Sequence, residues 1–185
     1  SSIEFVLVVD GVETTTKLTA NEANNWKVTF TDLNKYTAEG REIVYTVKES
    51  QVNYYKAPTY SADGLTVTNT IDYTSIMTSK EATKVWDDGD NKAGVRPNSV
   101  EFELYANKVT TNTKQTVSKV ENSNVWKTTF EGLQKYTADG EEIIYTFKEV
   151  TIPDGYVATV NNNVITNALP RIEVTKTVKS INGVD

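Results

Sequence analysis

One stretch of sequence occurs twice in this chain. Residues 24–49 read NNWKVTFTDLNKYTAEGREIVYTVKE and residues 124–149 read NVWKTTFEGLQKYTADGEEIIYTFKE, with most positions identical. An internal repeat of this length indicates two copies of one folding unit. The copies differ at their beginnings. The strand-like residues 80–87 precede the second copy, whereas the first copy begins only at its equivalent of residues 98–105, so it lacks an N-terminal strand of its own.

The composition excludes several classes of chemistry. The chain of 185 residues contains neither cysteine nor histidine, which removes disulfides, the commonest metal ligands and the commonest general base. We therefore expect no metal and no cofactor. The net charge of −6 and the even spread of lysines give no basic patch for nucleic acid. No apolar run reaches the length needed to span a membrane.

Alternation of β-branched or aromatic residues with polar ones predicts short strands, for example at residues 27–30, 42–47 and 100–105. Asp-Gly pairs between such runs are turn signals. Short strands at regular spacing, without a helical period, predict an all-β protein of two tandem sandwiches.

The repeat also sets the predicted domain limits. We place the first domain at residues 1–71, a linker at 72–79 and the second, complete domain at 80–169. Residues 170–185 are predicted to hold a linker and the first strand of a further repeat, because residues 171–178 resemble the beginning of the second domain.

Three polar residues fall on strand faces that are otherwise apolar. Lys84 lies between an alanine and a tryptophan on one face, Glu149 continues an aromatic row, and Asn167 follows an isoleucine. The first copy repeats two of them as Glu49 and Asn69. One reading is an ordinary ion pair with an asparagine before a loop.

The other reading is a covalent crosslink. A lysine desolvated among aromatic residues loses affinity for its proton and becomes a nucleophile. A glutamate in the same pocket stays protonated and polarises the asparagine carboxamide. Attack by the lysine nitrogen then expels ammonia and leaves an isopeptide bond between Lys84 and Asn167.

A series of motifs carries a family resemblance. They are, in chain order, residues 83–88, 94–97, 100–105, 126, 145–149, 153–156 and 164–167. Together they closely resemble the CnaB-type domain, the stalk module of Gram-positive collagen-binding adhesins and of many sortase-assembled pilins. The resemblance implies an inverse immunoglobulin-like β-sandwich. It also implies an isopeptide bond from Lys84 to Asn167, with Glu149 as the proton shuttle.

The resemblance further implies a function. The chain is expected to be a stalk or spacer of an extracellular, cell wall-attached adhesin or pilin, with adjacent repeats of the same protein as partners. A single self-crosslinking reaction is not turnover, so the chain is not expected to be an enzyme. Two alternatives are a ligand-binding adhesin module and an intermolecular crosslinking unit.

The first copy resembles the family from residue 2 to 69 but lacks the lysine strand. Glu49 is the equivalent acid, and Asn69 is a possible acceptor. Three explanations stay open: the chain was cut after its first strand, a separate peptide supplies the strand, or Lys176 of a neighbouring molecule does so and creates a strand-swapped oligomer. Closure by Lys176 of the same chain is geometrically unfavourable, because the second repeat lies between Lys176 and Asn69. We favour the first explanation and place the neighbouring molecule second.

The acidic run at residues 87–91 has the composition of a calcium loop. Its spacing departs from the EF-hand pattern at Lys92. We therefore expect a solvated acidic loop there.

Overall fold

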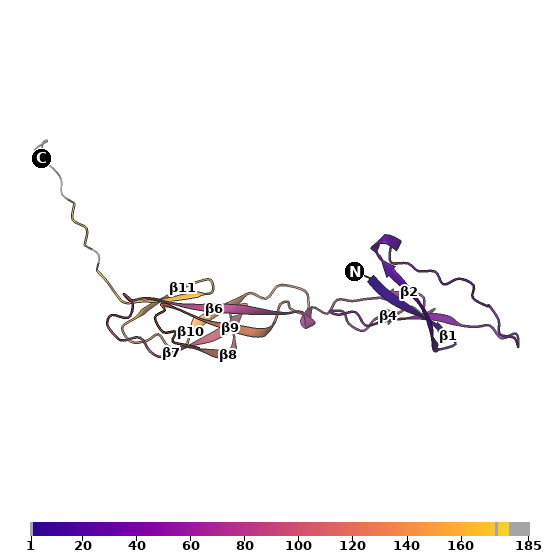
Figure 1. The fold of residues 1–185 in the computed structure, drawn as a ribbon, viewed down its shortest axis with the longest axis horizontal. Coiled ribbons are helices and arrows are strands. Elements are labelled where there is room, and N and C mark those ends of the chain that lie inside the picture. Colours follow the sequence, from indigo (N-terminus) through magenta and orange to yellow (C-terminus); the bar gives the residue numbers. More distant parts are fainter. Residues whose placement is uncertain (1, 173, 178–185) are drawn as a thin grey trace, which may run out of the picture. The chain divides into compact units, whose positions relative to one another are not determined.

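The computed structural model describes residues 2–172 and 174–177, and the chain divides into two compact units. The first comprises Ser1–Ile76 with Gln134–Glu141, and the second comprises Met77–Leu133 with Glu142–Asp185. The described part of both units is almost entirely strand, turn and loop (Figure 1). The prediction of an all-β protein is therefore confirmed.

The first unit has a three-stranded sheet in the order β2-β1-β3 and a two-stranded sheet of β4 and β5. Its elements are β1 (Ser2–Val9), β2 (Val12–Asn21), the 3₁₀ turn η1 (Glu22–Asn24), β3 (Tyr45–Glu49), β4 (Thr59–Tyr60), β5 (Val67–Thr68) and the 3₁₀ turn η2 (Tyr73–Ser75). β1 and β2 form a hairpin because Asp10 and Gly11 both adopt the positive φ that a tight primed turn needs. The two 3₁₀ turns were not predicted.

The second unit is a sandwich of two sheets, one in the order β10-β7-β8 and the other β11-β12-β6-β9 (Figure 1). Its strands are β6 (Met77–Asp87), β7 (Ser99–Ala106), β8 (Val109–Ser118), β9 (Val125–Gln134), β10 (Tyr145–Glu149), β11 (Val157–Asn161) and β12 (Val164–Ala168). β6 runs parallel to β12, while β11 is antiparallel to β12. β6 begins at Met77, inside the segment that we predicted to be a linker.

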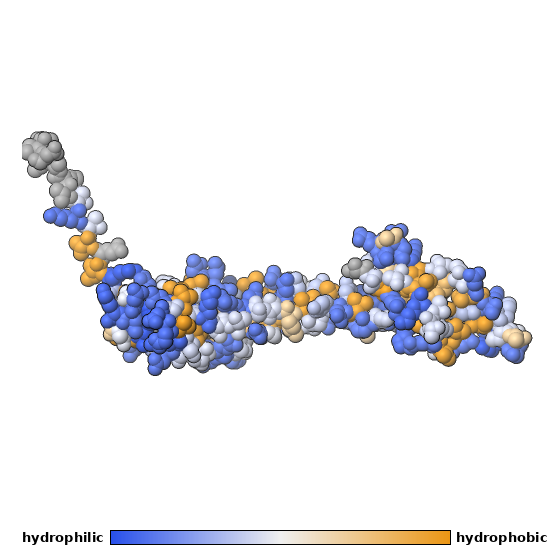
Figure 2. All heavy atoms as spheres, viewed as in Figure 1, coloured by the Kyte–Doolittle hydropathy of each residue, from blue (hydrophilic) through white to orange (hydrophobic). Residues whose placement is uncertain are grey.

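The core of the second unit lies between its two sheets. Every strand except β11 contributes a buried apolar side chain, because alternate residues of each strand point to the same side. The fully or almost fully buried members include Ala82, Trp86, Phe102, Leu104, Val117, Trp126, Phe130, Phe147 and Ile165. The first unit buries far less, and apolar side chains reach its surface (Figure 2).

One predicted strand is absent from the first unit. Residues 27–30 form no strand, although their counterparts in β9 do. β9 is hydrogen-bonded to β6, and no strand of the described first unit takes the place of β6. The sequence alternation was read correctly, but a strand also needs a neighbour for its backbone N–H and C=O groups.

The trailing segment also shows no strand in its described part. Residues 171, 172 and 174–177 are exposed and pair with no other strand, while residue 178 of the predicted strand lies outside the described residues. A strand needs a neighbouring strand for its backbone hydrogen bonds, and this segment has none among the described residues.

Candidate functional site

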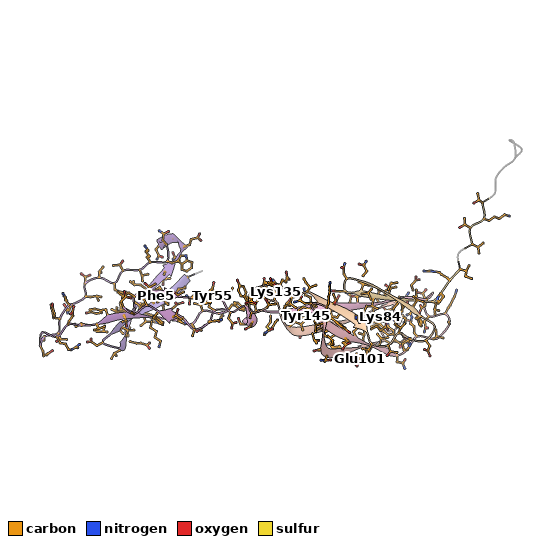
Figure 3. The ribbon with its side chains drawn as sticks, turned by 180° about the vertical axis from the view of Figure 1, so that it is seen from behind. Phe5, Tyr55, Lys84, Glu101, Lys135 and Tyr145 are labelled. Atoms are coloured by element: carbon orange, nitrogen blue, oxygen red, sulfur yellow. The ribbon has the colours of Figure 1, made fainter. Side chains whose placement is uncertain are left out.

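Lys84 is the buried lysine that the strand pattern predicted. It lies on the inward face of β6, its exposed fraction is 0%, and it is surrounded by core strands (Figure 3). The parallel pairing of β6 with β12 places Lys84 opposite Ile165. Its Nζ lies 4.6 Å from the centre of the Trp86 ring, which is a cation–π contact for the charged form of the amine.

Glu149 reaches Lys84 from the opposite sheet. It is the last residue of β10 and pairs with Phe102 of β7, so its side chain enters the core beside an aromatic ring. The Glu149 side chain is only 2% exposed, and its Oε2 lies 3.4 Å from Lys84 Nζ. Its other oxygen, Oε1, accepts a hydrogen bond of 3.1 Å from Asn167 Nδ2. One carboxyl group therefore contacts both of the other residues.

Asn167 completes the cluster from β12. Its exposed fraction is 0%, and its Oδ1 has no hydrogen-bond partner among the described residues. An unsatisfied buried carbonyl oxygen is costly in a folded protein and often marks a functional site. Here the oxygen belongs to the carboxamide that a nucleophile would attack, and Glu149 contacts the nitrogen of the same carboxamide.

Burial moves both titratable groups toward their neutral forms. It lowers the pKa of Lys84 from 10.5 to about 8, although the Glu149 carboxylate opposes the change. Burial also raises the pKa of Glu149, against the opposing effects of Lys84 and Asn167. A neutral amine is a nucleophile and a neutral carboxyl is a proton donor, so the same desolvation favours both states that an amide-forming reaction needs.

The first unit contains the acid and the amide without the lysine. Asn69 Nδ2 donates a hydrogen bond of 2.7 Å to Glu49 Oε1, as Asn167 does to Glu149. Glu49 is 5% exposed, and its Oε2 has no hydrogen-bond partner among the described residues. Lys176, the possible donor, is exposed in the trailing segment.

A second polar cluster was not predicted. The side chain of Asp88 is 0% exposed. It accepts hydrogen bonds of 2.7 Å from Arg96 Nε and 2.9 Å from the Tyr156 hydroxyl, and it forms an ion pair with Arg96. The expectation of a solvated acidic loop is therefore wrong at Asp88. The sequence signal was present, because all three residues belong to the motifs that carry the family resemblance.

This second cluster adjoins the first through one aromatic ring. Arg96 lies 5.5 Å from the Trp86 ring, and the Tyr156 ring packs edge-on against it at 5.0 Å. The Arg96 hydrogen bond is the main reason that the pKa of Asp88 falls to about 2, while burial and Asp88 raise the pKa of Tyr156 to about 12. Arg96 and Tyr156 therefore pack against the Trp86 ring, which in turn contacts Lys84.

The described residues hold no group of three or more His, Cys, Asp or Glu side chains that could bind a metal ion. Nor does the described part include a helix of the length and apolarity that a membrane span requires.

Comparison with known proteins places both repeats in one family. The model of the Cna protein B-type domain matches residues 1–70 and 81–168. The chain belongs to this family. Both the predicted family resemblance and the prediction of two tandem domains of the inverse immunoglobulin-like type are thereby confirmed.

Other proteins match the chain over most of its length. A collagen adhesin of Staphylococcus aureus is 37% identical over 177 residues, a match that covers 96% of this chain and 14% of the adhesin. The chain thus spans about one-seventh of that relative. The crystal structure of a single B repeat unit of the S. aureus collagen-binding surface protein Cna is 34% identical, with 91% of this chain and 88% of that one covered and a TM-score of 0.46. The shaft pilin SpaA of Lactobacillus rhamnosus GG is 17% identical, with coverages of 94% and 89% and a TM-score of 0.27.

Proposed function

We propose that the chain is a pair of structural repeats in the stalk of a Gram-positive cell-surface adhesin or pilin, and that an isopeptide bond between Lys84 and Asn167 stabilises the second repeat. Membership of the B-type family supports the stalk role. The observation that carries the crosslink is the buried cluster in which Glu149 contacts both the lysine amine and the asparagine amide. The proposed repeats are residues 1–71 and 80–169 with residues 72–79 between them, and β6 extends the second repeat back to Met77.

The proposed reaction is an amide transfer within the folded domain. The neutral Lys84 Nζ attacks Cγ of Asn167, and a new C–N bond forms. The bond from Cγ to Nδ2 breaks, and Nδ2 leaves as ammonia after it receives a proton. Glu149 first donates a hydrogen bond to the carboxamide oxygen, and then carries the proton from the attacking nitrogen to the leaving one.

The fold positions the reacting groups and excludes water from them. Three side chains from three strands are held together, so the reaction is unimolecular and most of its entropic cost is met by folding. The surrounding core excludes water, which would compete as nucleophile and would keep the amine charged. The second repeat would react only once, so the proposed chemistry is not enzymatic turnover.

The bond would join neighbouring strands at the two ends of the domain. β6 is the first strand of the second unit and β12 is its last, and the two are hydrogen-bonded in parallel. A covalent link between them carries tension directly from one to the other, without separating the hydrogen-bonded ladder. It also closes a loop of more than eighty residues, which by the loop-entropy estimate stabilises the fold by about 4 to 5 kcal/mol.

The location follows from the same family. We place the whole protein outside the cell and attached to the wall, where a long array of repeats would hold a binding region away from the surface. Adjacent repeats of the same protein are the proposed partners of these two domains.

Intact mass spectrometry of the denatured chain tests the crosslink. We expect the wild type to be one ammonia lighter than its sequence, and a proteolytic fragment to contain both Lys84 and Asn167. Lys84→Met, Asn167→Ala and Glu149→Gln should each restore the full mass. Glu49→Ala is the matched control, since it removes the equivalent carboxyl of the other repeat and should leave the loss unchanged. A wild-type chain with its full sequence mass would refute the bond.

A second candidate function is intermolecular crosslinking, in which residues 171–178 of one copy complete the first repeat of another. One observation favours it: Glu49 and Asn69 are paired as Glu149 and Asn167 are, and Glu49 Oε2 has no hydrogen-bond partner among the described residues. A ligand-binding role has no comparable support.

A further inference from the structure

Trp86 carries a buried hydrogen-bond donor that has no acceptor. Its side chain is 2% exposed, and its indole Nε1 has no hydrogen-bond partner among the described residues. Tryptophan N–H groups usually find a partner when they are buried. Trp126 follows this rule, because its Nε1 donates a hydrogen bond of 3.3 Å to the Ser123 carbonyl oxygen. The unpaired N–H of Trp86 therefore needs an explanation.

An acceptor that has no donor lies in the same core. Three buried side-chain polar atoms lack a partner in the described part of the chain, and Trp86 Nε1 is the single donor among them. One of the two acceptors, Glu49 Oε2, belongs to the other unit. The second acceptor is Oδ1 of Asn167, in the same unit as Trp86. The core of the second unit thus contains one unpaired donor and one unpaired acceptor.

Strand pairing makes these two residues neighbours. In the parallel ladder of β6 and β12, Trp86 is the direct partner of Asn167, just as Lys84 is the partner of Ile165. Neighbouring strands lie about 4.7 to 4.9 Å apart. Both side chains are buried on the core side of their strands. The indole N–H and the carboxamide are therefore adjacent groups of one sheet face.

The Trp86 ring also borders the amine and is held in place around its edge. Lys84 Nζ lies 4.6 Å from the ring centre and 3.4 Å from Glu149 Oε2. The rings of Trp126 and Tyr156 each lie 5.0 Å from the Trp86 ring, at interplanar angles of 60° and 71°. A donor on a ring that is packed in this way does not have to reorient during a reaction.

The proposed reaction places charge on the carboxamide oxygen. When Lys84 Nζ bonds to Cγ of Asn167, the electron pair of the C=O bond moves onto Oδ1, and it returns when the bond to Nδ2 breaks. Glu149 lies on the nitrogen side of this centre, because its Oε1 accepts from Nδ2 and its Oε2 contacts Nζ. Its proton is required by the ammonia that leaves. A second donor is therefore needed at Oδ1 while the charge is present.

We propose that the indole N–H of Trp86 is the oxyanion donor of the reaction between Lys84 and Asn167. As Cγ becomes tetrahedral, Oδ1 leaves the plane of the carboxamide and accepts a hydrogen bond from Nε1. After ammonia has left, the carbonyl oxygen of the isopeptide keeps this hydrogen bond, so neither atom stays unpaired in the product. The inference rests on the proposed crosslink and adds a catalytic residue that acts on oxygen, while Glu149 moves the proton between the two nitrogens.

The rate of ammonia loss by the full chain tests this role. Chain made in a short cell-free synthesis is followed by intact mass spectrometry from the moment synthesis is stopped. Trp86→Phe keeps an aromatic ring but has no N–H, and we expect it to lose ammonia about 100-fold more slowly. Trp126→Phe is the matched control, because it makes the same change at a buried tryptophan whose N–H serves the Ser123 carbonyl. It should react at close to the wild-type rate.

A pH profile of the rate separates loss of the donor from loosened packing. The donor acts on the oxygen, so Trp86→Phe should lower the rate by the same factor at every pH. Water admitted by a looser core would instead return the pKa of Lys84 toward its usual 10.5. The slowing would then disappear at high pH, and that result would contradict the proposal.

The hydrogen bond can also be observed without substitution of Trp86. The chain has three tryptophans, so its ¹H–¹⁵N spectrum should contain three indole signals. We expect the Trp86 signal to lie further downfield in the crosslinked wild type than in Asn167→Ala, which has no carboxamide oxygen. The Trp126 signal is the internal control and should keep its position. A Trp86 signal at the same position in both chains would contradict the hydrogen bond.

The two proposals fail in different ways. A wild type that loses ammonia, with Trp86→Phe reacting at the same rate, would refute the role of Trp86 and leave the crosslink in place. Equal slowing in Trp86→Phe and Trp126→Phe would also refute it, because both effects would then come from packing. A wild type that keeps its full sequence mass would refute the crosslink and with it the oxyanion donor.

Discussion

The Nζ of Lys84 lies 3.4 Å from Oε2 of Glu149, and neither side chain reaches solvent. An ion pair removed from water in this way stabilises a fold weakly at best, because desolvation of both charges offsets their attraction. Conversion of the lysine into an amide removes both charges from the core. The burial of this pair supports the proposed reaction, of which it would be the starting state.

A chain that cannot react should show the titration of Lys84. In Asn167→Ala the pKa of Lys84 stays near 8 in the folded state and near 10.5 in the unfolded state. Between these values the unfolded chain binds more protons, so the free energy of unfolding should rise as the pH increases from about 8 toward 10.5. Denaturant titrations at several pH values measure this rise.

The matched control for that titration is the double variant Lys84→Met with Asn167→Ala, which lacks the group. Subtraction of its pH profile from that of Asn167→Ala gives the contribution of Lys84 to the pH dependence of the free energy of unfolding. The wild type should also lack the rise, because an amide nitrogen does not titrate. Parallel profiles for the single and double variants would show that burial leaves the proton affinity of Lys84 unchanged.

The crosslink should contribute strongly to the stability of the second unit. Asn167→Ala keeps Lys84 and Glu149 but cannot close the loop, and we expect it to lose about 4 to 5 kcal/mol. Urea unfolding followed by tryptophan fluorescence measures the change. Asn69→Ala in the first unit is the control, since it removes the equivalent amide and should leave the second transition in place. Similar midpoints for wild type and Asn167→Ala would argue against a closed loop.

The buried polar residues of the site could be predicted from sequence because strand geometry is regular. Side chains alternate strictly along a strand, so a lysine between alanine and tryptophan must enter the core if the strand has a buried face. The family resemblance then supplied which three strands meet. The buried positions of Lys84, Glu149 and Asn167 follow from these two facts, and their contacts follow from the fold.

Two other features depended on distant parts of the chain and were not predictable in the same way. Residues 27–30 carry the alternation of a strand, but whether they form one depends on a neighbouring strand that the local sequence does not specify. Asp88 has the composition of a solvated loop, yet Arg96 and Tyr156 enclose it, and Tyr156 is far away in sequence. The local sequence alternation predicts which way a side chain points from its strand, whereas its burial depends on which distant residues pack against it.

The two equivalent tryptophans should respond differently to removal. Trp126→Ala deletes a side chain that is 0% exposed and should cost the second unit about 3 to 5 kcal/mol. Trp26→Ala deletes one that is 46% exposed and should change the stability of the first unit by less than about 1 kcal/mol. Thermal unfolding followed by circular dichroism measures both. Equal losses would mean that Trp26 is buried in the first unit in solution.

The pair of Asp88 and Arg96 should make the second unit sensitive to acid. Hydrogen bonds from Arg96 and Tyr156 lower the pKa of Asp88 from its usual 3.8 to about 2 in the folded state. A carboxyl with a depressed pKa contributes stability above its unfolded value and loses it as the pH falls through the folded value. About 2 kcal/mol should therefore disappear between about pH 4 and pH 2.

Asp88→Asn should remove this part of the acid response and should also destabilise the unit at neutral pH, because Arg96 remains buried without its partner. Denaturant titrations at pH 7, 4 and 2 would separate the two effects. Asp154→Asn, at an exposed position of the same unit, is the control and should leave both the neutral stability and the acid response as in the wild type. If the acid response is unchanged in Asp88→Asn, other carboxyl groups cause it.

Asp88→Asn should also loosen the packing of the Trp86 ring, which contacts both Arg96 and Lys84. Slower formation of the Lys84 crosslink in this variant would show that the two clusters are coupled.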